Sequence, residues 1–256
     1  MSRKIKKSVT TKTTVKNAKY YQEEMLRLFE QKAGKYSVKE IFNDWLEWNF
    51  MTMEAMKGFS IEEFRNTIYR LLKKYSKEDF EDFQKINDLL EEGIVKTQED
   101  ILGVVFMKME PNKKLGQFFT PTCTCELMTK LNHSDFVDLK KVVEETDVFE
   151  VGDPTCGGGA MFINYYVNAK KEGIDTDKIL FRGMDIDRRC VMMAILQMEL
   201  LEMAGEVQWG DTLTRKMYGK YITSKEYVKR YGRTKLLMNM LMYHKMVDEI
   251  MKEMAA

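Results

Sequence analysis

Three short stretches of the chain combine glycines with acidic residues directly after apolar runs. They read GDPTCGGG at 152–159, GMDID at 183–187 and GDTL at 210–213. Glycines just before a helix let the backbone approach a ligand and leave amide N–H groups free to bind it. The acid Asp185, which follows the glycines by about thirty residues, has the type and place to hold a ribose diol. One glycine turn is often only a turn, but three polar strand ends in succession predict a nucleoside-containing cofactor.

The apolar runs before these turns are interpreted as strands, at residues 148–151, 179–184 and 207–209. Segments with helical character lie between them, at 160–171 and 188–204. Alternating strands and helices are typical of a parallel sheet, in which ligands bind beyond the carboxyl ends of the strands. The sequence therefore predicts an α/β fold with the site at one edge of the sheet.

The first hundred residues are predicted to be helical. Four hydroxyl residues are each followed three positions later by an acid, a pattern typical of helix starts, at Ser37, Ser60, Ser76 and Thr97. Apolar residues recur between them at intervals of three and four, as in a packed bundle. A further helix is expected to begin at Pro121, capped by Thr120, and to continue through Leu131.

Positive charge is concentrated at the two ends of the chain. Residues 1–19 hold seven Lys and Arg and no acid, and residues 215–235 hold eight against Glu226 alone. Such segments are either solvated surfaces or nucleic-acid contacts. On the second interpretation, the candidate DNA-binding residues are Lys4, Lys6, Lys7, Arg215, Lys216, Lys229, Arg230 and Arg233.

Composition argues against several other classes of protein. No apolar run is long enough to span a membrane, and the basic start is not followed by a signal-peptide core, so we expect a cytoplasmic protein. The four cysteines include no pair of C-x-x-C knuckles, and the two histidines are not spaced as metal ligands. We therefore expect no metal, and cysteines that are structural or incidental.

The order of four motifs resembles a known family. GQFFTP (116–121), DPTCGGG (153–159), GMDID (183–187) and GDTL (210–213) follow one another as in DNA adenine-N6 methyltransferases of the γ motif order. The similarity is greatest to the modification subunits of type I restriction systems and their shorter relatives from phages and mobile elements. It covers roughly residues 98–214.

The resemblance implies S-adenosylmethionine as cofactor and a Rossmann-like methyltransferase sheet, here partial. Thr120, with the backbone around Phe118 and Phe119, would hold the carboxylate of the cofactor, and Asp153 would hold its ammonium group. The cofactor-binding positions that the resemblance implies are Phe118, Phe119, Thr120, Asp153, Thr155, Gly157, Gly159, Asp185, Ile186 and Asp211.

The remaining roles concern the nucleoside and the glycine loop. By the same resemblance, Asp185 would bind the ribose hydroxyls, Ile186 would pack on the adenine and Asp211 would accept from its amino group. Gly157 and Gly159 would allow the close approach of the loop.

One family element is absent from these residues. A (D/N/S)PP(F/Y/W) turn holds the target adenine in the family, but the prolines here are Pro111, Pro121 and Pro154, with no adjacent pair. We therefore expect a protein that binds S-adenosylmethionine and DNA without independent catalysis, with no catalytic residue assigned. An active small adenine methyltransferase, or a methyltransferase for proteins or small molecules, are the alternatives. A partner chain and a homo-oligomer both remain open.

Four regions are expected along the chain. They are a basic disordered tail at 1–19, a helical region at 20–112 packed against the sheet, a cofactor-binding domain at 113–214, and a basic helical segment at 215–256.

Overall fold

The structure of the protein is a computed structural model. It describes residues 16–34, 36–109, 120, 124–125, 127–128 and 136–255. The candidate residues Lys4, Lys6, Lys7, Phe118 and Phe119 lie outside the described residues, as does most of the helix expected after Thr120.

Helices make up the amino-terminal half of the described chain and alternate with strands in the rest. The helices are α1 (Ala18–Gln31), α2 (Val38–Met56), α3 (Ile61–Lys74), α4 (Lys77–Thr97), α5 (Leu102–Met109), α7 (Phe136–Glu145), α8 (Ala160–Lys171), the 3-10 helix η1 (Thr176–Lys178), α9 (Arg188–Leu200), α10 (Ser224–Tyr231) and α11 (Arg233–Ala255). The strands are β1 (Phe149–Asp153), β2 (Ile179–Asp185), β3 (Gly205–Asp211) and β4 (Lys216–Ile222).

The predicted helix starts are confirmed at three of the four positions. The Ser37 side chain accepts from the amide of Glu40, and Ser76 forms a full capping box with Asp79. Helix α3 also begins directly after Ser60, although that serine adopts a left-handed conformation and makes no capping bond through its side chain. Local capping bonds therefore account for the starts at Ser37 and Ser76, whereas the start after Ser60 forms without one.

The prediction of a helix start at Thr97 is wrong. Thr97 is the last residue of α4, and its hydroxyl donates to the carbonyl oxygen of Gly93. The next helix, α5, begins at Leu102, and the Asp100 carboxylate accepts from the amide of Gly103. Asp100 therefore has the capping role that the sequence pattern assigned to Thr97. The left-handed conformation of Gln98 ends α4, so a new helix can begin only further along the chain.

The three predicted strands are confirmed and form a sheet in the order β1-β2-β3-β4. β1 pairs with β2 and β2 with β3 in parallel, and β4 returns antiparallel to β3. Strand β4 departs from the expected helical segment at 215–256: residues 216–222 complete a hairpin, and helices begin only at Ser224. The hairpin alternates poorly in hydrophobicity and carries a bulge between Trp209 and Gly210, so its sequence gives little signal of a strand.

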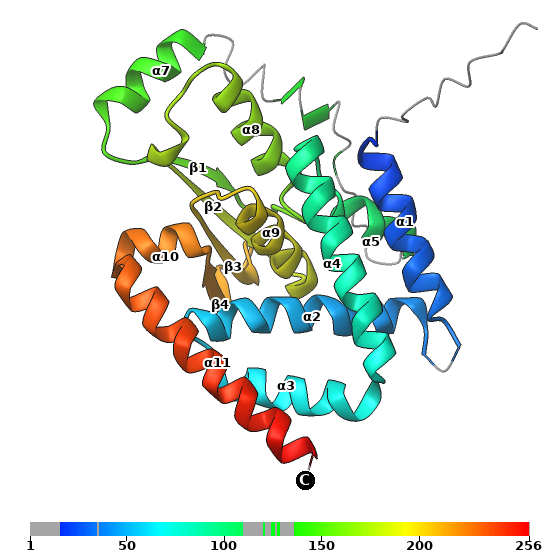
Figure 1. Cartoon of the computed structure of the whole chain (residues 1–256). Coiled ribbons are helices and arrows are strands. Elements are labelled where there is room, and N and C mark those ends of the chain that lie inside the picture. The colour runs from blue at the N-terminus through cyan, green and yellow to red at the C-terminus, as the bar shows by residue number, and fades with distance from the viewer. Residues whose placement is uncertain are drawn as a thin grey trace, which may run out of the picture.

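The two faces of the sheet are covered differently (Figure 1). Helices α8 and α9 pack on one face, where Phe162 and Tyr165 contact the ring of Phe181. The opposite face carries an ionic network in which buried Glu206 binds Arg182 at 3.1 Å and Arg230 at 2.7 Å. One face of the sheet is therefore apolar and covered by helices, and the other is polar.

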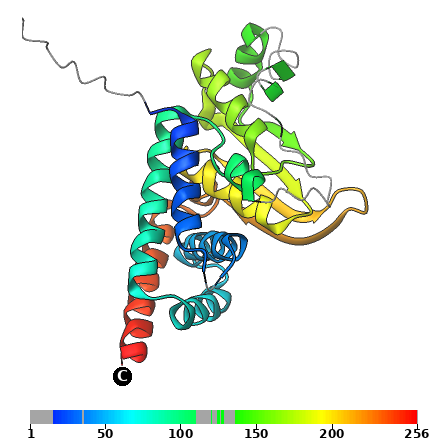
Figure 2. The same ribbon diagram turned by 90° about the vertical axis from the view of Figure 1, so that its right-hand side faces the viewer.

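Helix α9 joins the helical region to the sheet. It packs on β2 and β3 with one side and on α2, α4 and α5 with the other. Figure 2 shows the long helices α1 and α4 on one side of the molecule and the β3–β4 hairpin projecting on the opposite side. A single cluster of buried side chains runs from Trp45 in α2 to Phe181 in β2, so the two regions share one core.

None of the helices in the described ranges is long and apolar enough to cross a membrane.

Candidate functional site

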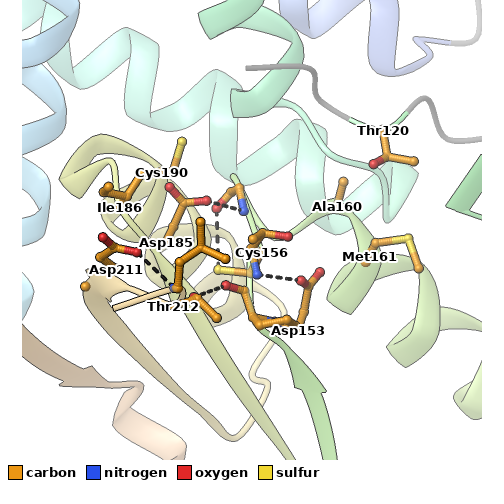
Figure 3. Close-up of a pocket in the computed structure, with 15 residues that line it drawn as sticks. Thr120, Asp153, Cys156, Ala160, Met161, Asp185, Ile186, Cys190, Asp211 and Thr212 are labelled. Carbon is orange, nitrogen blue, oxygen red and sulfur yellow. Dashed lines mark hydrogen bonds between the residues drawn. The ribbon is translucent and has the colours of Figure 1, made fainter. Parts of the chain in front are cut away.

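A cavity of about 590 Å³ opens at the carboxyl ends of β1, β2 and β3, within the size range of small-molecule sites (Figure 3). Its walls come from the three turns singled out in the sequence. The lining residues are Thr120, Asp153, Pro154, Thr155, Cys156, Gly157, Ala160, Met161, Asp185, Ile186, Cys190, Gly210, Asp211, Thr212 and Leu213. The structure thus brings together the described cofactor candidates with the exception of Gly159.

Asp153 ends strand β1 and shapes the start of the glycine loop. Its carboxylate accepts from the amide of Thr155 at 2.9 Å, which closes a tight turn around Pro154. Among the described residues Asp153 forms no ion pair, so the rest of its charge faces the cavity uncompensated. This is the charge and position suited to an ammonium group of a ligand.

Asp185 ends strand β2 and binds the glycine loop to it. One carboxylate oxygen accepts from the amide of Gly157 at 2.9 Å, and the other accepts from the amide of Asp187 at 2.8 Å. Burial raises the pKa of Asp185, and the two backbone amides only partly oppose this rise. A half-buried carboxylate without a cation partner among the described residues is well placed to bind hydroxyl groups.

Asp211 ends strand β3 and lies on the open side of the cavity. It accepts from the amide of Leu213 at 2.9 Å, and hydrogen bonding from Thr214 lowers the pKa of its carboxyl group. Leu213, at the tip of the hairpin, is 95% exposed. Ile186, on the neighbouring loop, is 63% exposed. Two apolar side chains and one ionised acid therefore surround this end of the cavity.

The two candidate glycines have different surroundings. Gly157 lines the cavity with a φ of 54°, a left-handed conformation that favours glycine. Gly159, with a φ of 91°, faces helix α9: a Cβ there would lie 3.3 Å from the Cα of Ala194. Gly159 therefore permits the close packing of α8 against α9. This packing fixes the position of α8, the helix that follows the loop.

Cys156 and Cys190, which were expected to be structural or incidental, both line the cavity. Burial, with the nearby charge of Asp185, raises the pKa of both Cys156 and Cys190, so both thiols remain protonated at neutral pH. They contribute small apolar surface rather than a nucleophile. Met161, Thr212 and Leu213 also line the cavity but were not predicted as site residues. Thr212 and Leu213 belong to the motif at 210–213, and Met161 lies close behind the glycine loop.

A buried network connects the helical region to the glycine loop. The side-chain amide of Gln197, on α9, donates to the carbonyl oxygen of Gly158 and to Asp100, both at 2.8 Å. Its oxygen accepts from the amides of Ile101 and Leu102 at 2.9 and 3.0 Å. Gln197 is fully buried. The conformation of the loop therefore depends on Gln197, which no local motif indicated, and on Asp100, which the sequence placed only at a helix start.

Two of the basic candidates lie at the mouth of the cavity. Arg215 and Lys216 directly follow the turn at the tip of the β3–β4 hairpin, and both are exposed. Within the described part of the chain neither forms an ion pair, and the Lys216 ammonium lies 5.3 Å from the centre of the Tyr218 ring.

The other basic candidates lie beyond the far end of β4, roughly 20 Å away at about 3.3 Å per residue. Arg230 is held by Glu206 at 2.7 Å and by Glu226 at 2.6 Å, and Lys229 donates to the carbonyl oxygen of Asp177. Arg233 is exposed at the start of α11. The candidates Arg215 and Lys216 therefore lie at one end of β4, and Lys229, Arg230 and Arg233 lie beyond the other.

No group of three His, Cys, Asp or Glu side chains within the described ranges is arranged to hold a metal ion.

Comparisons with known proteins concern the family and the fold of the chain. A model of the N-6 DNA methylase family matches residues 98–229, which include the lining residues and the β3–β4 hairpin. No curated protein sequence matches the chain. Among solved structures, the chain is similar to a Listeria monocytogenes protein described as a class I S-adenosylmethionine-dependent methyltransferase, with 15% identity and a TM-score of 0.45 over 87% of this chain and 70% of that one.

Proposed function

The chain belongs to the N-6 DNA methylase family, and we propose that it binds S-adenosylmethionine in the cavity at the ends of β1, β2 and β3 and provides the cofactor half of adenine methylation in DNA. S-adenosylmethionine is the cofactor of this family, and the sheet of the family is Rossmann-like. A place in restriction and modification, as in the type I subunits that the motifs resemble, is part of the proposal.

The observation that carries the proposal is the convergence of Asp153, Asp185 and Asp211 on one cavity. Asp153 and Asp211 accept from backbone amides of their own turns, and Asp185 accepts from the amides of Gly157 and Asp187. None of the three forms an ion pair with a cation of the described residues. Three acids with uncompensated charge are costly unless a ligand with matching donors binds them. S-adenosylmethionine offers such donors in its ammonium group, its ribose hydroxyls and its adenine amino group.

The residues present fit the cofactor along its length. Asp153 would bind the ammonium group, Asp185 the ribose hydroxyls and Asp211 the adenine amino group. Ile186 and Leu213 are exposed apolar side chains at the mouth of the cavity and would pack on the adenine ring. Thr120 lines the same cavity and would donate its hydroxyl to the cofactor carboxylate. The bound cofactor supplies an activated methyl group.

These 256 residues offer no recognised group to receive an adenine. Their three prolines include no adjacent pair and none after Pro154. A flipped base costs a few kcal/mol of unstacking, which a stacking aromatic residue and fixed hydrogen-bond acceptors normally offset. We therefore propose that this stretch of chain binds the cofactor and DNA but does not transfer the methyl group by itself.

DNA is the proposed partner because the family acts on DNA and because Arg215 and Lys216 are exposed beside the cavity. Two cations that form no ion pair with the described residues would bind backbone phosphates here and place the duplex next to the cofactor. This binding would be largely independent of DNA sequence, since phosphate contacts position the protein and do not read bases.

The test combines calorimetry with a transfer assay. S-adenosylmethionine titrated into the protein should bind at one site, and labelled S-adenosylmethionine with mixed duplex DNA should leave adenine unlabelled. Absence of any binding heat at millimolar cofactor would refute the proposed site. Stoichiometric labelling of adenine would instead establish the alternative, an active small adenine methyltransferase.

A further inference from the structure

Cationic and aromatic side chains alternate along one row at the β3–β4 hairpin. The guanidinium of Arg188, at the start of α9, lies 5.7 Å from the centre of the Trp209 ring. The Trp209 ring lies 5.2 Å from the ring of Tyr218, with their planes at 52°. The ammonium of Lys216 lies 5.3 Å from the centre of the Tyr218 ring. Four side chains from α9, β3 and β4 therefore form one continuous stack.

A β-bulge explains how the two rings meet. The ladder shifts register between Trp209 and Gly210. The residues paired with them are Gly219 and Met217, which leaves Tyr218 as an extra residue of β4. In a regular strand, successive side chains point to opposite faces, so Tyr218 would point away from the face that Trp209 shares with Gly219. A bulge re-aims the side chain of such an extra residue, and the contact between the rings depends on it.

The backbone near the tip of the hairpin is also irregular. A Cβ on Gly210 would lie 2.6 Å from the carbonyl oxygen of Lys216, so the close approach of the two strands requires a glycine there. Arg215 has a φ of 57°, a left-handed conformation that is uncommon outside glycine. Conformations of this kind are concentrated at functional sites. Both features shape the part of the hairpin that presents Lys216 and Tyr218.

The stack is open to solvent and begins next to the cofactor cavity. The indole N–H of Trp209 donates to the carbonyl oxygen of Ile186 at 3.1 Å, and Ile186 lines the cavity. Tyr218 is 47% exposed. Figure 2 shows that the hairpin projects from the body of the molecule. A ligand on the exposed ring of Tyr218 would therefore lie close to the mouth of the cavity.

The two cations of the stack are incompletely neutralised. Lys216 forms no ion pair within the described part of the chain. Arg188 has a long contact of 3.8 Å with Glu47, and its Nε has no hydrogen-bond partner among the described residues. The row of aromatic rings thus carries positive charge at both ends, which favours a ligand that combines flat apolar groups with negative charge.

We propose that Trp209 and Tyr218 form a stacking site for an unpaired base of DNA. The inference rests on the proposed function for its choice of DNA as the partner. Aromatic rings beside basic residues bind single strands, because the rings stack on bases while the cations follow the phosphates. On binding, the Lys216 ammonium would leave the Tyr218 ring for a phosphate and free the ring for the base. Arg188 would hold the Trp209 ring through its cation–π contact.

An unpaired base suits this surface better than an intact duplex. The bases of a duplex are stacked on one another, and a protein ring reaches them only when a base leaves the stack. A single strand presents bases and phosphates in alternation, as the hairpin presents rings and cations. Stacking accepts any base, because every base has a π-face. The site would therefore hold an unpaired base beside the cofactor cavity without selecting an adenine.

The test uses three DNA probes with the 256-residue protein. They share one fluorescein-labelled duplex, which is fully paired, carries one extra unpaired 2-aminopurine nucleotide, or carries an abasic spacer in place of that nucleotide. In anisotropy titrations the protein should bind the 2-aminopurine probe roughly tenfold more tightly than the abasic probe, as expected for the stacking of one base. The 2-aminopurine fluorescence should fall on binding, because stacking quenches it.

Tyrosine variants locate the stacking ring. Tyr218→Leu should remove both the preference and the quenching, whereas Tyr218→Phe keeps the ring and should retain both. Tyr231→Leu is the matched control. Tyr231 is 46% exposed and has the Lys235 ammonium 4.9 Å from its ring centre, but it lies on α10, beyond the far end of β4. This control should bind the three probes as the original protein does, and urea unfolding checks that each variant is folded.

Each other outcome overturns the inference. Equal affinity for the 2-aminopurine and abasic probes excludes a stacked base, as does unchanged fluorescence of the bound probe, and neither result depends on a variant. An undiminished preference in Tyr218→Leu excludes Tyr218, and an equal loss in Tyr231→Leu places the stacking ring on α10.

Calorimetry with S-adenosylmethionine on the same samples separates the two proposals. A protein that binds the cofactor and the paired duplex, but shows no preference for the unpaired base, retains the proposed function and loses this inference. A protein that prefers the unpaired base but binds no cofactor refutes the proposed cofactor site and keeps the stacking surface.

Discussion

Acidic residues have different hydrogen-bond partners in the helical region and at the carboxyl ends of the strands. Asp44, on α2, is bound by three side chains: Arg70 at 2.6 Å, Lys74 at 2.5 Å and Tyr75 at 2.9 Å. Asp185, on β2, is bound by two backbone amides and, in the described part of the chain, by no cation. The side chain of Asp44 is buried and that of Asp185 is half-buried, but among described residues only Asp44 has cations that neutralise its charge.

The pKa values of the two acids shift in opposite directions. Burial alone would raise the pKa of Asp44, but hydrogen bonds from Lys74 and Arg70 outweigh it and lower the pKa. Burial raises the pKa of Asp185 because its amide partners compensate less. The first arrangement stabilises the fold, and the second leaves charge available for a ligand. Perturbed acids at a cavity without partners are typical of functional sites.

The largest effect is expected at Asp44. Replacement by Ala leaves Lys74 and Tyr75 without their shared acceptor, and the free energy of unfolding should fall by about 3 kcal/mol. Urea unfolding measures this change, and cofactor affinity of the folded protein should be unaltered. Glu81→Gln, at an exposed acid of α4, is the matched control and should change stability little. Equal losses in the two variants would refute a stabilising role for the Asp44 cluster.

The next effect concerns Gln197, where the two regions meet. Gln197→Leu removes the partners of Gly158 and of the Ile101 amide from a buried site, and unfolding free energy should fall by about 2 kcal/mol. The glycine loop should lose its fixed conformation, so affinity for S-adenosylmethionine should fall as well. Calorimetry and urea unfolding check the two parts separately. A stable variant with full cofactor affinity would show that the network does not support the loop.

Removal of Asp185 should weaken cofactor binding more than folding. Asp185→Ala should reduce binding of S-adenosylmethionine by about 1–3 kcal/mol, because a charged acceptor for the ribose hydroxyls is lost. The control is Asp175→Ala, which also removes a carboxylate that accepts a backbone amide, that of Asp177, but lies away from the cavity. If both variants bind the cofactor equally well, Asp185 does not contact it.

The same two acids should give opposite dependences of stability on pH. The lowered pKa of Asp44 means that its contribution is present at neutral pH and is lost as pH falls through its folded-state value. The raised pKa of Asp185 means that the folded state loses stability as pH rises from the unfolded value through the folded one. Chemical unfolding measures this between acidic and neutral pH. As pH rises, the difference in unfolding free energy between the original protein and Asp44→Ala should grow. The corresponding difference for Asp185→Ala should shrink. Parallel curves would contradict the comparison.

The smallest effect is expected on DNA binding. Replacing Arg215 and Lys216 by Ala should reduce the slope of log affinity against log salt by about 1.8, as expected for two lost phosphate contacts. Lys229→Ala, at a lysine already bound to the carbonyl of Asp177, should change the slope much less. Gel shifts or anisotropy over a range of salt concentrations measure both. A larger change in Lys229→Ala would move the DNA surface to α10.

The sequence alone determined the features that depend on neighbours in the chain. Ser37 and Ser76 cap helices because their hydroxyls reach an amide three residues ahead. Asp153, Asp185 and Asp211 line one cavity because parallel strands end at the same edge of a sheet. The order of apolar runs, glycines and acids in the sequence is enough to predict these three aspartates.

The tertiary structure decided what depends on residues far apart in the chain. Asp44 meets Arg70 and Lys74 across two helices, and Gln197 reaches Gly158 from a different element, so no local pattern predicts either contact. The same limit applies to Thr97, because α4 ends there before the left-handed residue Gln98, and the next helix begins only at Leu102 with Asp100 as its capping residue. The pairing that made β4 a strand and placed β1 at the end of the described sheet depends on which segments lie side by side. That is a property of the folded sheet rather than of any short sequence.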